Sequence, residues 1–245
     1  MRILLNIGNT HTSAVLCRDG ALEGTVEQLS TENLLAGGTL ELMARHPELP
    51  CFAACVVPAA RRWLQQSRPA DSVRFIAAAD APRPDFSRVD ASTLGQDRIA
   101  NAVGALSVHA APVIVLDCGT ALTTEVIDAD GVFLGGVIAP GRRALAAALH
   151  ANTAQLPEVC PPETPTAALA ANTTDALRGG ISIGILGLAQ KLIDESRREL
   201  QTPNCPVLVA GGDARYFLEH LPLSNLDAAP AHLTLLGLAT LEPNL

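Results

Sequence analysis

The sequence has few lysines, few aromatic residues and little charge. Lys191 is the single lysine among 245 residues, which excludes a phosphate-binding loop built on a lysine. Aromatic residues make up 3% of the chain and leave little material for stacking nucleic-acid bases. The formal net charge of −8 also opposes binding to a phosphate backbone. We therefore expect no nucleic acid among its partners.

The six cysteines form no metal-binding pattern. Only Cys51 and Cys55 are close in sequence, and no second cysteine or histidine pair completes a zinc site. We therefore expect buried thiols in a reducing compartment. The apolar start of the chain is too short for a signal peptide, and no apolar run reaches the roughly 20 residues of a membrane span. These features predict a soluble, cytoplasmic protein without membrane contact.

Two segments of the chain, residues 3–24 and 113–135, resemble each other. Each reads as an apolar strand, an Asn/Asp-x-Gly-Asn/Thr turn, a second strand and an Asp-Gly turn. Asp-Gly between apolar runs is a strong signal for a β-hairpin. The pair predicts two related halves, residues 1–110 and 111–245, each opening with a hairpin.

The remaining sequence alternates between strand and helix patterns, which predicts the α/β class. Expected strands cover residues 51–57, 73–77 and 206–210. Residues 157–165, rich in proline, predict an ordered loop, and Arg142 and Arg143 are expected on a solvated face. Expected helices cover residues 58–67, 96–108, a stretch from 145, 173–200 and an amphipathic last helix over 231–241.

The repeated turns have a composition that suits phosphate binding. They combine backbone N–H groups, a polar side chain and an oxygen for a cation. A tight hairpin also needs Gly and Asn, so one turn alone favours neither interpretation. Two such turns, with Gly211-Gly212 after a later strand, favour a nucleotide site. This is the pattern of the actin, hexokinase and Hsp70 superfamily, in which two ribonuclease-H-like lobes surround a nucleotide cleft.

The segment from Leu94 to Arg98 lies between the two turns in the sequence. Asp97 at a helix N-terminus beside a phosphate site could accept a hydroxyl proton. Arg98 could bind a carboxylate or a phosphate in a forked arrangement. An Asp-Arg pair is also common on solvated helix ends, so the pair alone leaves both interpretations open.

Seven motifs follow one another between residue 3 and about residue 240. They are Asn6-Ile-Gly-Asn-Thr10, Leu94-Gly-Gln-Asp-Arg98, Asp117-Cys-Gly-Thr120, Leu134-Gly-Gly-Val-Ile-Ala-Pro-Gly141, Thr153-Ala-Gln-Leu-Pro157, Asn172-Thr173 and Ala210-Gly-Gly212. In order and spacing they resemble type III pantothenate kinase, the family that also includes the Bvg accessory factor proteins. The resemblance implies ATP-dependent phosphorylation of pantothenate, the first step of coenzyme A synthesis. It also implies a homodimer, a nucleotide bound with Mg²⁺, and a monovalent cation, K⁺ or NH₄⁺.

The resemblance implies roles for individual residues as well. Asp97 corresponds to the proton acceptor, and Asp117 to the ligand of the monovalent cation. The pantothenate contacts are Val89, Gly95, Gln96, Asp97, Arg98 and Thr173. The ATP contacts are Asn6, which also stands at the Mg²⁺ position, Gly8, Asn9, Thr10, His11, Thr12, Ser13, Thr120, Gly211 and Gly212.

The sequence departs from the family pattern at the metal position and in the substrate pocket. Asn6 stands where the family usually has Asp, and an amide lacks the negative charge that a hard cation favours. Val89 replaces a tyrosine of the substrate pocket, and Ala91 replaces a proline. These changes favour an alternative, a weak or inactive homologue that binds nucleotide or pantothenate in a regulatory role. A kinase for another small hydroxylated acid is a third hypothesis.

Overall fold

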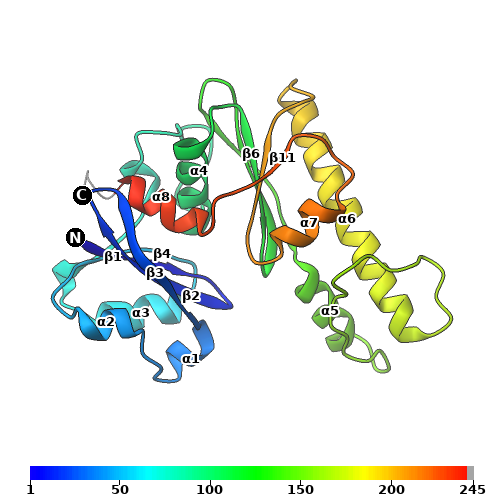
Figure 1. The fold of residues 1–245 in the computed structure, drawn as a ribbon, viewed down its shortest axis with the longest axis horizontal. Helices are drawn as coiled ribbons and strands as arrows, with labels where there is room; N and C mark the ends of the chain where they lie inside the picture. The colour runs from blue at the N-terminus through cyan, green and yellow to red at the C-terminus, as the bar shows by residue number, and fades with distance from the viewer. Residues whose placement is uncertain (242–245) are drawn as a thin grey trace. The chain divides into compact units, whose positions relative to one another are not determined.

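The structure is a computed structural model that describes residues 1–241, and it divides into two compact units (Figure 1). Unit 1 contains Met1–Ala111, Ala129–Leu134 and, at the end of the described chain, residues 232–241. Unit 2 contains Pro112–Asp128 and Gly135–Ala231. The chain thus leaves unit 1 close to the expected boundary and returns to it twice.

Unit 1 is built on a five-stranded sheet in the order β3-β2-β1-β4-β5. The first three strands pair antiparallel, whereas β4 pairs parallel with β1, and β5 pairs parallel with β4. Since β1 and β4 are buried on both faces, their near-continuous apolar sequence is what a central strand requires. The strand bounds are β1 (Arg2–Ile7), β2 (His11–Arg18), β3 (Ala21–Ser30), β4 (Cys51–Cys55) and β5 (Val73–Phe75).

The Asp-Gly turn of the first hairpin forms as the sequence predicts. Asp19 and Gly20 join β2 to β3, with φ values of 50° and 81°. Positive φ at both central residues defines a type I′ turn, whose twist matches that of the flanking strands. Asp-Gly is among the sequences that adopt it at low cost.

Helices cover both faces of the sheet in unit 1 (Figure 1). Alternate residues of β1 pack with three helices, of which α1 contributes Leu34, α2 Met43 and α3 Leu64. Helices α4 and α8 contact each other and strands β1 and β4. The bounds are α1 (Thr31–Leu35), α2 (Glu41–Arg45), α3 (Pro58–Ser67), α4 (Gln96–Val108) and α8 (Leu233–Leu241), with short 3₁₀ turns η1 (Ala70–Ser72) and η2 (Ala78–Asp80).

The last helix differs from the expectation in both its place and its character. The sequence analysis put residues 111–245 in one lobe, but α8 packs on α4 in unit 1. It is also buried on nearly every side and is not amphipathic. A close backbone crossing explains the packing, because a Cβ on Gly237 would stand 1.9 Å from the carbonyl oxygen of Ala100. Buried Thr234 donates to Asn101 Oδ1 at 2.8 Å across the same crossing.

The second sheet has the order β11-β10-β6-β7-β8, with β9 paired to β7, and lies in unit 2 except for the first two residues of β8. Strand β6 pairs antiparallel with β7 and parallel with β10, which pairs parallel with β11. The strand bounds are β6 (Val113–Cys118), β7 (Ala121–Ile127), β8 (Phe133–Gly135), β9 (Ile138–Pro140), β10 (Val207–Ala210) and β11 (Leu226–Ala228). The helices are α5 (Arg142–Ala151), α6 (Thr173–Glu199) and α7 (Ala214–His220).

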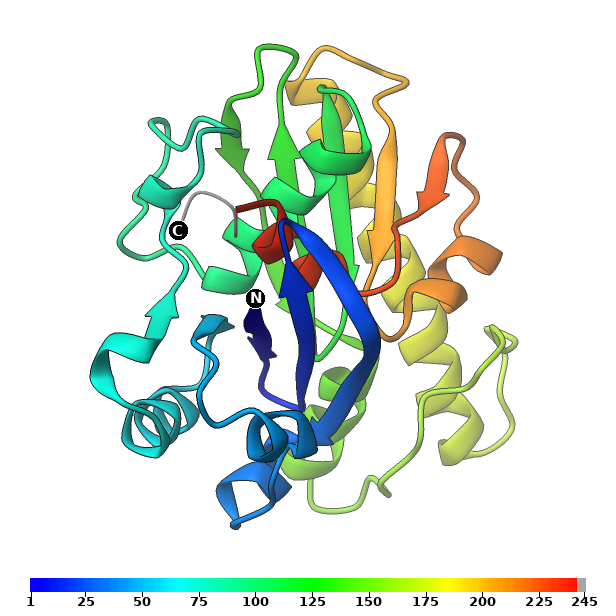
Figure 2. The ribbon, with the colours of Figure 1, turned by 60° about the vertical axis from the view of Figure 1, so that its left-hand side comes forward.

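Helix α6 runs along one face of the sheet of unit 2 (Figure 2). Ile185, Ala189 and Ile193, spaced four residues apart, pack with buried residues of β6 and β10. Within residues 1–241, α6 is the one helix long and apolar enough to cross a membrane, where the sequence analysis expected none. This is weak evidence for a membrane, because core helices of soluble proteins have the same length and composition.

The two sheets share one topology, which confirms the internal repeat. In each, an antiparallel hairpin (β1–β2 or β6–β7) is followed by two parallel strands (β4 and β5, or β10 and β11) on the side of its first strand. Parallel strands joined through helices on a hairpin base define the ribonuclease-H-like arrangement. The α/β class with two related lobes is therefore confirmed.

Candidate functional site

The first repeated turn joins β1 to β2 at the edge of unit 1. The Gly8 N–H donates to the His11 carbonyl at 3.0 Å, and the Thr31 hydroxyl donates to the Gly8 carbonyl at 2.7 Å. The Thr12 hydroxyl is fully buried and bonds that of Thr31 at 3.0 Å. Thr12 thus fastens the turn to α1, and Asn9, Thr10 and His11 are exposed.

Asn6 and Ser13 lie opposite each other at the base of this turn, on β1 and β2. Ser13 is buried, and its hydroxyl accepts from Gln28 Nε2 at 3.3 Å. Asn6 is partly exposed. The expected phosphate loop is therefore a rim of exposed residues on a hydrogen-bonded base.

Helix α4 begins at the predicted Gln96 with Gly95 as its N-cap. Gln96 Oε1 accepts from the Cys55 N–H at 2.9 Å, and Gln96 Nε2 donates to the Ile76 carbonyl at 2.6 Å. Both polar ends of the side chain therefore bind backbone at the ends of β4 and β5. In this structure Gln96 docks the helix onto the sheet edge.

This docking brings two of the predicted site segments to one edge of unit 1. Cys55 pairs with Ile7, and the Val56 N–H donates to the Ile7 carbonyl at 3.1 Å. Ile7 leads directly into the Gly8 turn, and Cys55 binds Gln96, the first residue of α4. The ends of β1, β4 and the start of α4 thus converge, although these segments are far apart in the sequence.

Asp97 lies half-buried in the first turn of α4. Its Oδ1 accepts from the Arg98 N–H at 2.8 Å. Burial raises the pKa of the Asp97 carboxyl, while that N–H and the Arg98 charge act to lower it. A carboxylate with a raised pKa at a helix N-terminus is a suitable general base.

Gly95 is required beside this carboxylate for steric reasons. A Cβ at position 95 would stand 2.6 Å from Asp97 Oδ1. Any other residue there would displace the carboxylate or the N-cap. The glycine of the predicted substrate segment is thus explained by close approach.

Val89 lies in the loop that leads to α4, half-buried, and its N–H donates to the Phe86 carbonyl at 3.3 Å. Phe86 itself packs on Phe133 with ring centroids 5.1 Å apart. The loop at Val89 is therefore a defined turn on an aromatic base.

The second repeated turn, in unit 2, joins β6 to β7. Asp117 lies at the end of β6 opposite Ala210 of β10. Gly211 follows with φ of +90°, and a Cβ on it would stand 2.4 Å from Asp117 Oδ1. The structure therefore places Gly211 against Asp117 at the second turn, and a shared binding role for them stays a prediction.

Gly141 closes the other side of this turn. Its N–H donates to the Thr120 carbonyl at 3.0 Å, and a Cβ there would stand 2.2 Å from the Gly119 carbonyl oxygen. Around Gly212, in contrast, nothing lies within 4 Å of the Cβ position. The loop thus combines a tight base with an open glycine that a planar ring could approach.

Oxygen donors at this turn fit a cation. The Asp117 carboxylate and the Gly119 and Thr120 carbonyls are the hard ligands that such ions prefer. Among residues 1–241, no group of three His, Cys, Asp or Glu side chains is placed to hold a metal ion.

Thr173 is the exposed first residue of α6. Its neighbour Asn172 caps the helix, accepting from the Asp175 N–H at 2.9 Å and donating to its carboxylate at 2.7 Å. The first turn of α6 thus presents Thr173 on an exposed, capped helix end, and its role as a substrate contact stays a prediction.

Arg142 does not lie on a solvated face, contrary to the expectation from the sequence. Arg143 is exposed as expected, but Arg142 is 3% exposed. Its guanidinium lies 3.7 Å from the Tyr216 ring centre, and Nη1 lies 3.4 Å from Asp213 Oδ1. The available signal was helical spacing, because Arg142 precedes the buried Ala146 by four residues.

The fold defines a class, α/β proteins built from two related lobes, and solved kinases share it. A protein from Campylobacter jejuni described as a Baf family transcriptional activator gives a TM-score of 0.61 at 18% identity, over 99% of this chain and 100% of that chain. The polyphosphate/ATP-glucomannokinase of Arthrobacter sp. strain KM gives 0.53 at 16% identity, over 100% of both. At these identities the likeness shows the fold.

Sequence comparison identifies the family. The model of type III pantothenate kinase matches residues 2–195. The type III pantothenate kinase of Paracoccus denitrificans is 40% identical over 158 residues, 64% of this chain and 58% of its own length. The type III pantothenate kinase of Treponema pallidum is 38% identical over 146 residues, which are 60% of this chain and 52% of its own length. The chain belongs to the type III pantothenate kinase family, and these matches span just over half of the relatives' own length.

Proposed function

We propose that this protein phosphorylates pantothenate with ATP, giving 4′-phosphopantothenate in the first step of coenzyme A synthesis. The observation that carries the proposal is the half-buried Asp97 at the start of α4, on the same sheet edge as the Gly8 turn. Family membership supplies the substrate. Phosphoryl transfer depends mainly on positioning and charge stabilisation, and such an edge can supply both.

In this proposal each segment of unit 1 has a separate task. Asp97 orients the primary hydroxyl of pantothenate and accepts its proton, and Arg98 binds the pantothenate carboxylate. Gln96 holds α4 in place through its two backbone hydrogen bonds. The exposed rim Asn9–His11 offers its backbone N–H groups to the ATP phosphates.

The segments of unit 2 complete the set of contacts. Thr120 and the Gly211–Gly212 loop bind the nucleotide, and Asp117 binds a monovalent cation, K⁺ or NH₄⁺. Thr173 is the substrate contact taken from the family pattern. Mg²⁺ bound with ATP would supply neutralisation of the phosphate charge, with Asn6 as its nearest protein ligand.

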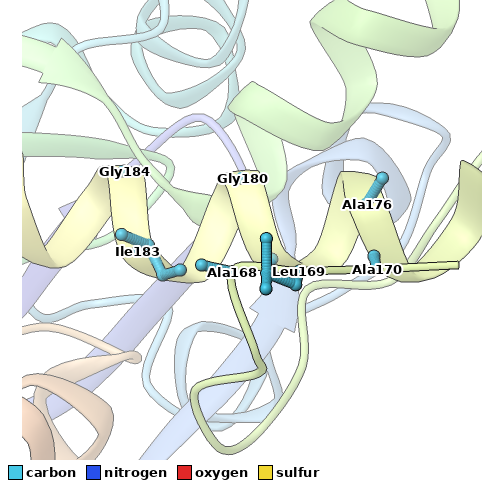
Figure 3. A pocket seen from close by; sticks show the side chains of 8 residues that line it. Ala168, Leu169, Ala170, Ala176, Gly180, Ile183 and Gly184 are labelled. Atoms are coloured by element: carbon cyan, nitrogen blue, oxygen red, sulfur yellow. The ribbon is translucent and has the colours of Figure 1, made fainter.

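The exposed face of α6 supports a homodimer as part of this proposal. Figure 3 shows residues 168–170 lying along α6, where they line an open pocket with Ala176, Gly180, Ile183 and Gly184. Leu169 is 94% exposed and Ile183 is 46% exposed. An apolar patch of this kind is usually an association surface, and we assign it to a second copy of the chain. We place the dimer in the cytoplasm.

The test is formation of 4′-phosphopantothenate from ATP and pantothenate with Mg²⁺ and either K⁺ or NH₄⁺ present. Asp97→Asn serves as the matched control, because it removes the base and keeps the shape of the side chain. Product formed by the natural protein and not by the variant supports the proposal. Nucleotide binding without any transfer would instead support the regulatory homologue, which Asn6 and Val89 favour.

A further inference from the structure

Arg142 is a buried cation held by three partners. Its guanidinium stacks on Tyr216, pairs with Asp213 and donates to the Pro162 carbonyl. Its Nε is buried without a hydrogen-bond partner. Burying such a charge is costly unless partners compensate for the lost water, so the contacts define one geometry for this side chain.

The partners of Arg142 belong to segments that are separate in the sequence. Asp213 and Tyr216 follow β10, and Pro162 lies in the proline-rich loop after α5. Arg142 itself begins α5 directly after Gly141. The side chain therefore bridges three connections of unit 2.

Two of these connections are also tied to the Asp117–Thr120 turn. The Asp213 N–H donates to the Cys118 carbonyl at 2.9 Å, and the Gly141 N–H donates to the Thr120 carbonyl at 3.0 Å. With the Arg142–Asp213 pair these bonds form a closed ring. The ring passes through the turn, through Gly141 and through the loop that carries Gly211 and Gly212.

At two glycines the backbones of this ring are in direct contact. A Cβ on Gly141 would stand 2.2 Å from the Gly119 carbonyl oxygen, and one on Gly211 would stand 2.5 Å from that of Cys118. The backbones are already in contact there and cannot move closer. The remaining freedom is for the Gly211–Asp213 loop to swing away, and the Arg142 contact opposes that motion.

We propose that Arg142 is a positioning residue for the nucleotide, because it holds the Gly211–Asp213 loop against the Asp117–Thr120 turn. The ligand is an adenine nucleotide, so the inference rests on the proposed function. Arg142 acts through the loop and makes no contact with the ligand itself. Its loss leaves Gly212 free to leave the nucleotide site.

Arg197 provides a matched comparison within the same unit. It is 5% exposed and donates to the Cys205 carbonyl at 3.0 and 2.9 Å and to the Ser224 carbonyl at 2.8 Å. Arg197 is thus equally buried and hydrogen-bonded, but its partners are outside the ring that contains the turn. Replacing it should cost stability without changing nucleotide affinity.

The experiment is equilibrium binding of ADP and of a non-hydrolysable ATP analogue by calorimetry, with Mg²⁺, on the full chain. The variants are Arg142→Met, Arg142→Lys, Asp213→Asn and the control Arg197→Met. We expect Arg142→Met and Asp213→Asn to bind about 10-fold more weakly and Arg142→Lys to recover part of the loss. Steady-state assays should show the increase in KM for ATP and not for pantothenate.

Two results would overturn the inference while the natural protein binds nucleotide. One is an unchanged nucleotide affinity in Arg142→Met. If that variant does not fold, unchanged nucleotide affinity in both Arg142→Lys and Asp213→Asn has the same meaning. The other is an equal loss of affinity in Arg197→Met, which indicates general loosening of the unit. A natural protein that binds nucleotide but does not phosphorylate pantothenate contradicts the proposed function alone. One that binds no nucleotide contradicts both.

Discussion

At the scale of single residues, Asp97, the proposed proton acceptor, carries a cost to stability. Its environment disfavours the charged form, since burial raises the pKa of the carboxyl despite the neighbouring Arg98 N–H and charge. The folded protein therefore holds a proton on Asp97 more tightly than the unfolded chain does. Functional groups are often kept in such unfavourable states.

The first prediction follows from this environment. Asp97→Asn should reduce phosphoryl transfer by roughly 10²- to 10⁴-fold, because the general base is lost, and should leave nucleotide affinity unchanged. It should also raise the Tm near neutral pH, where the natural carboxylate is charged and disfavoured by burial. Rate assays and thermal unfolding measure the two effects.

The pH dependence of the Tm tests whether the pKa of Asp97 is raised in the folded protein. Because the folded pKa lies above the unfolded one, the destabilisation by Asp97 is present above the folded pKa and disappears as the pH falls below the unfolded one. The Tm difference between the natural protein and Asp97→Asn should therefore vanish in acid. The transfer rate of the natural protein should fall on acidification, starting at a higher pH than an ordinary aspartate would give. A Tm difference that grows in acid would contradict the assignment.

The second prediction concerns Asn6. Restoring the acid with Asn6→Asp should tighten Mg²⁺-ATP and raise turnover by roughly 5- to 150-fold, because a carboxylate attracts the cation more strongly than an amide does. The measurement is the Mg²⁺ dependence of the rate and of nucleotide binding. If neither changes, the Gly8 turn is not the metal site. Weaker ATP binding would mean that the added charge repels the phosphates.

Residue-level roles were only partly predictable from the sequence. The helix start at Gln96, beside Asp97, and the two hairpin turns could be predicted from local patterns, whereas the roles of Asp97 and Asp117 stay predictions. The contacts of Gln96 and the burial of Arg142 could not be predicted, because they depend on segments 20 to 71 residues away along the chain. Such long-range partners leave no periodic signal.

At the scale of elements, the glycines of α4 and α8 differ from those of α6. Gly237 in α8 and Gly104 in α4 permit a backbone crossing, since a Cβ on Gly104 would stand 2.5 Å from the Leu233 carbonyl oxygen. Gly180, Gly184 and Gly187 in α6 have nothing within 4 Å of the Cβ position. The sequence analysis could detect the glycines but not which of them are in contact.

The third prediction uses this contrast. Gly237→Ala should lower the free energy of unfolding by about 1–3 kcal/mol, because the methyl group meets the Ala100 carbonyl. Gly187→Ala, the matched control, should raise it by about 0.5–1 kcal/mol by favouring the helix. Chemical denaturation of both variants gives the comparison. An unchanged unfolding free energy in Gly237→Ala would contradict the close crossing.

The strands and most helices were predictable because their signals are local. Helices α3 and α4 begin and end where the Pro58 start and the apolar spacing from Gln96 indicate. The sequence predicted the wrong lobe for α8, because an apolar sequence indicates burial but not the element against which the helix packs. Its burial on nearly all sides results from tertiary packing.

At the scale of the whole molecule, the chain repeats one sheet topology and adapts each copy. In unit 1, Gln96 docks α4 beside the hairpin. In unit 2, Arg142 pairs with Asp213 in the loop that follows Gly211. The duplication was predictable from two matching turns because each turn is a short, local pattern. The different additions were not, since they arise outside the repeated segments.

The fourth prediction tests association of the chain. Ile183→Asp places a charge on the exposed apolar face of α6, beside the segment 168–170 that contains the exposed Leu169. We expect the natural protein to sediment as a dimer and the variant to dissociate at least 10-fold more readily. Sedimentation equilibrium measures this, with Arg143→Asp as an exposed control on α5. Identical dissociation constants for the two variants would exclude this face.

The return of the chain to unit 1 has a consequence for its synthesis. The contacts of α8 with α4 and β1 are made by residues that leave the ribosome after all of unit 2 has been synthesised. Until then the Gly104 face of α4 has no covering helix and stays exposed to water. Unit 1 can therefore not finish folding in the usual order from the N-terminus, and its core closes only after residues 232–241 have been synthesised.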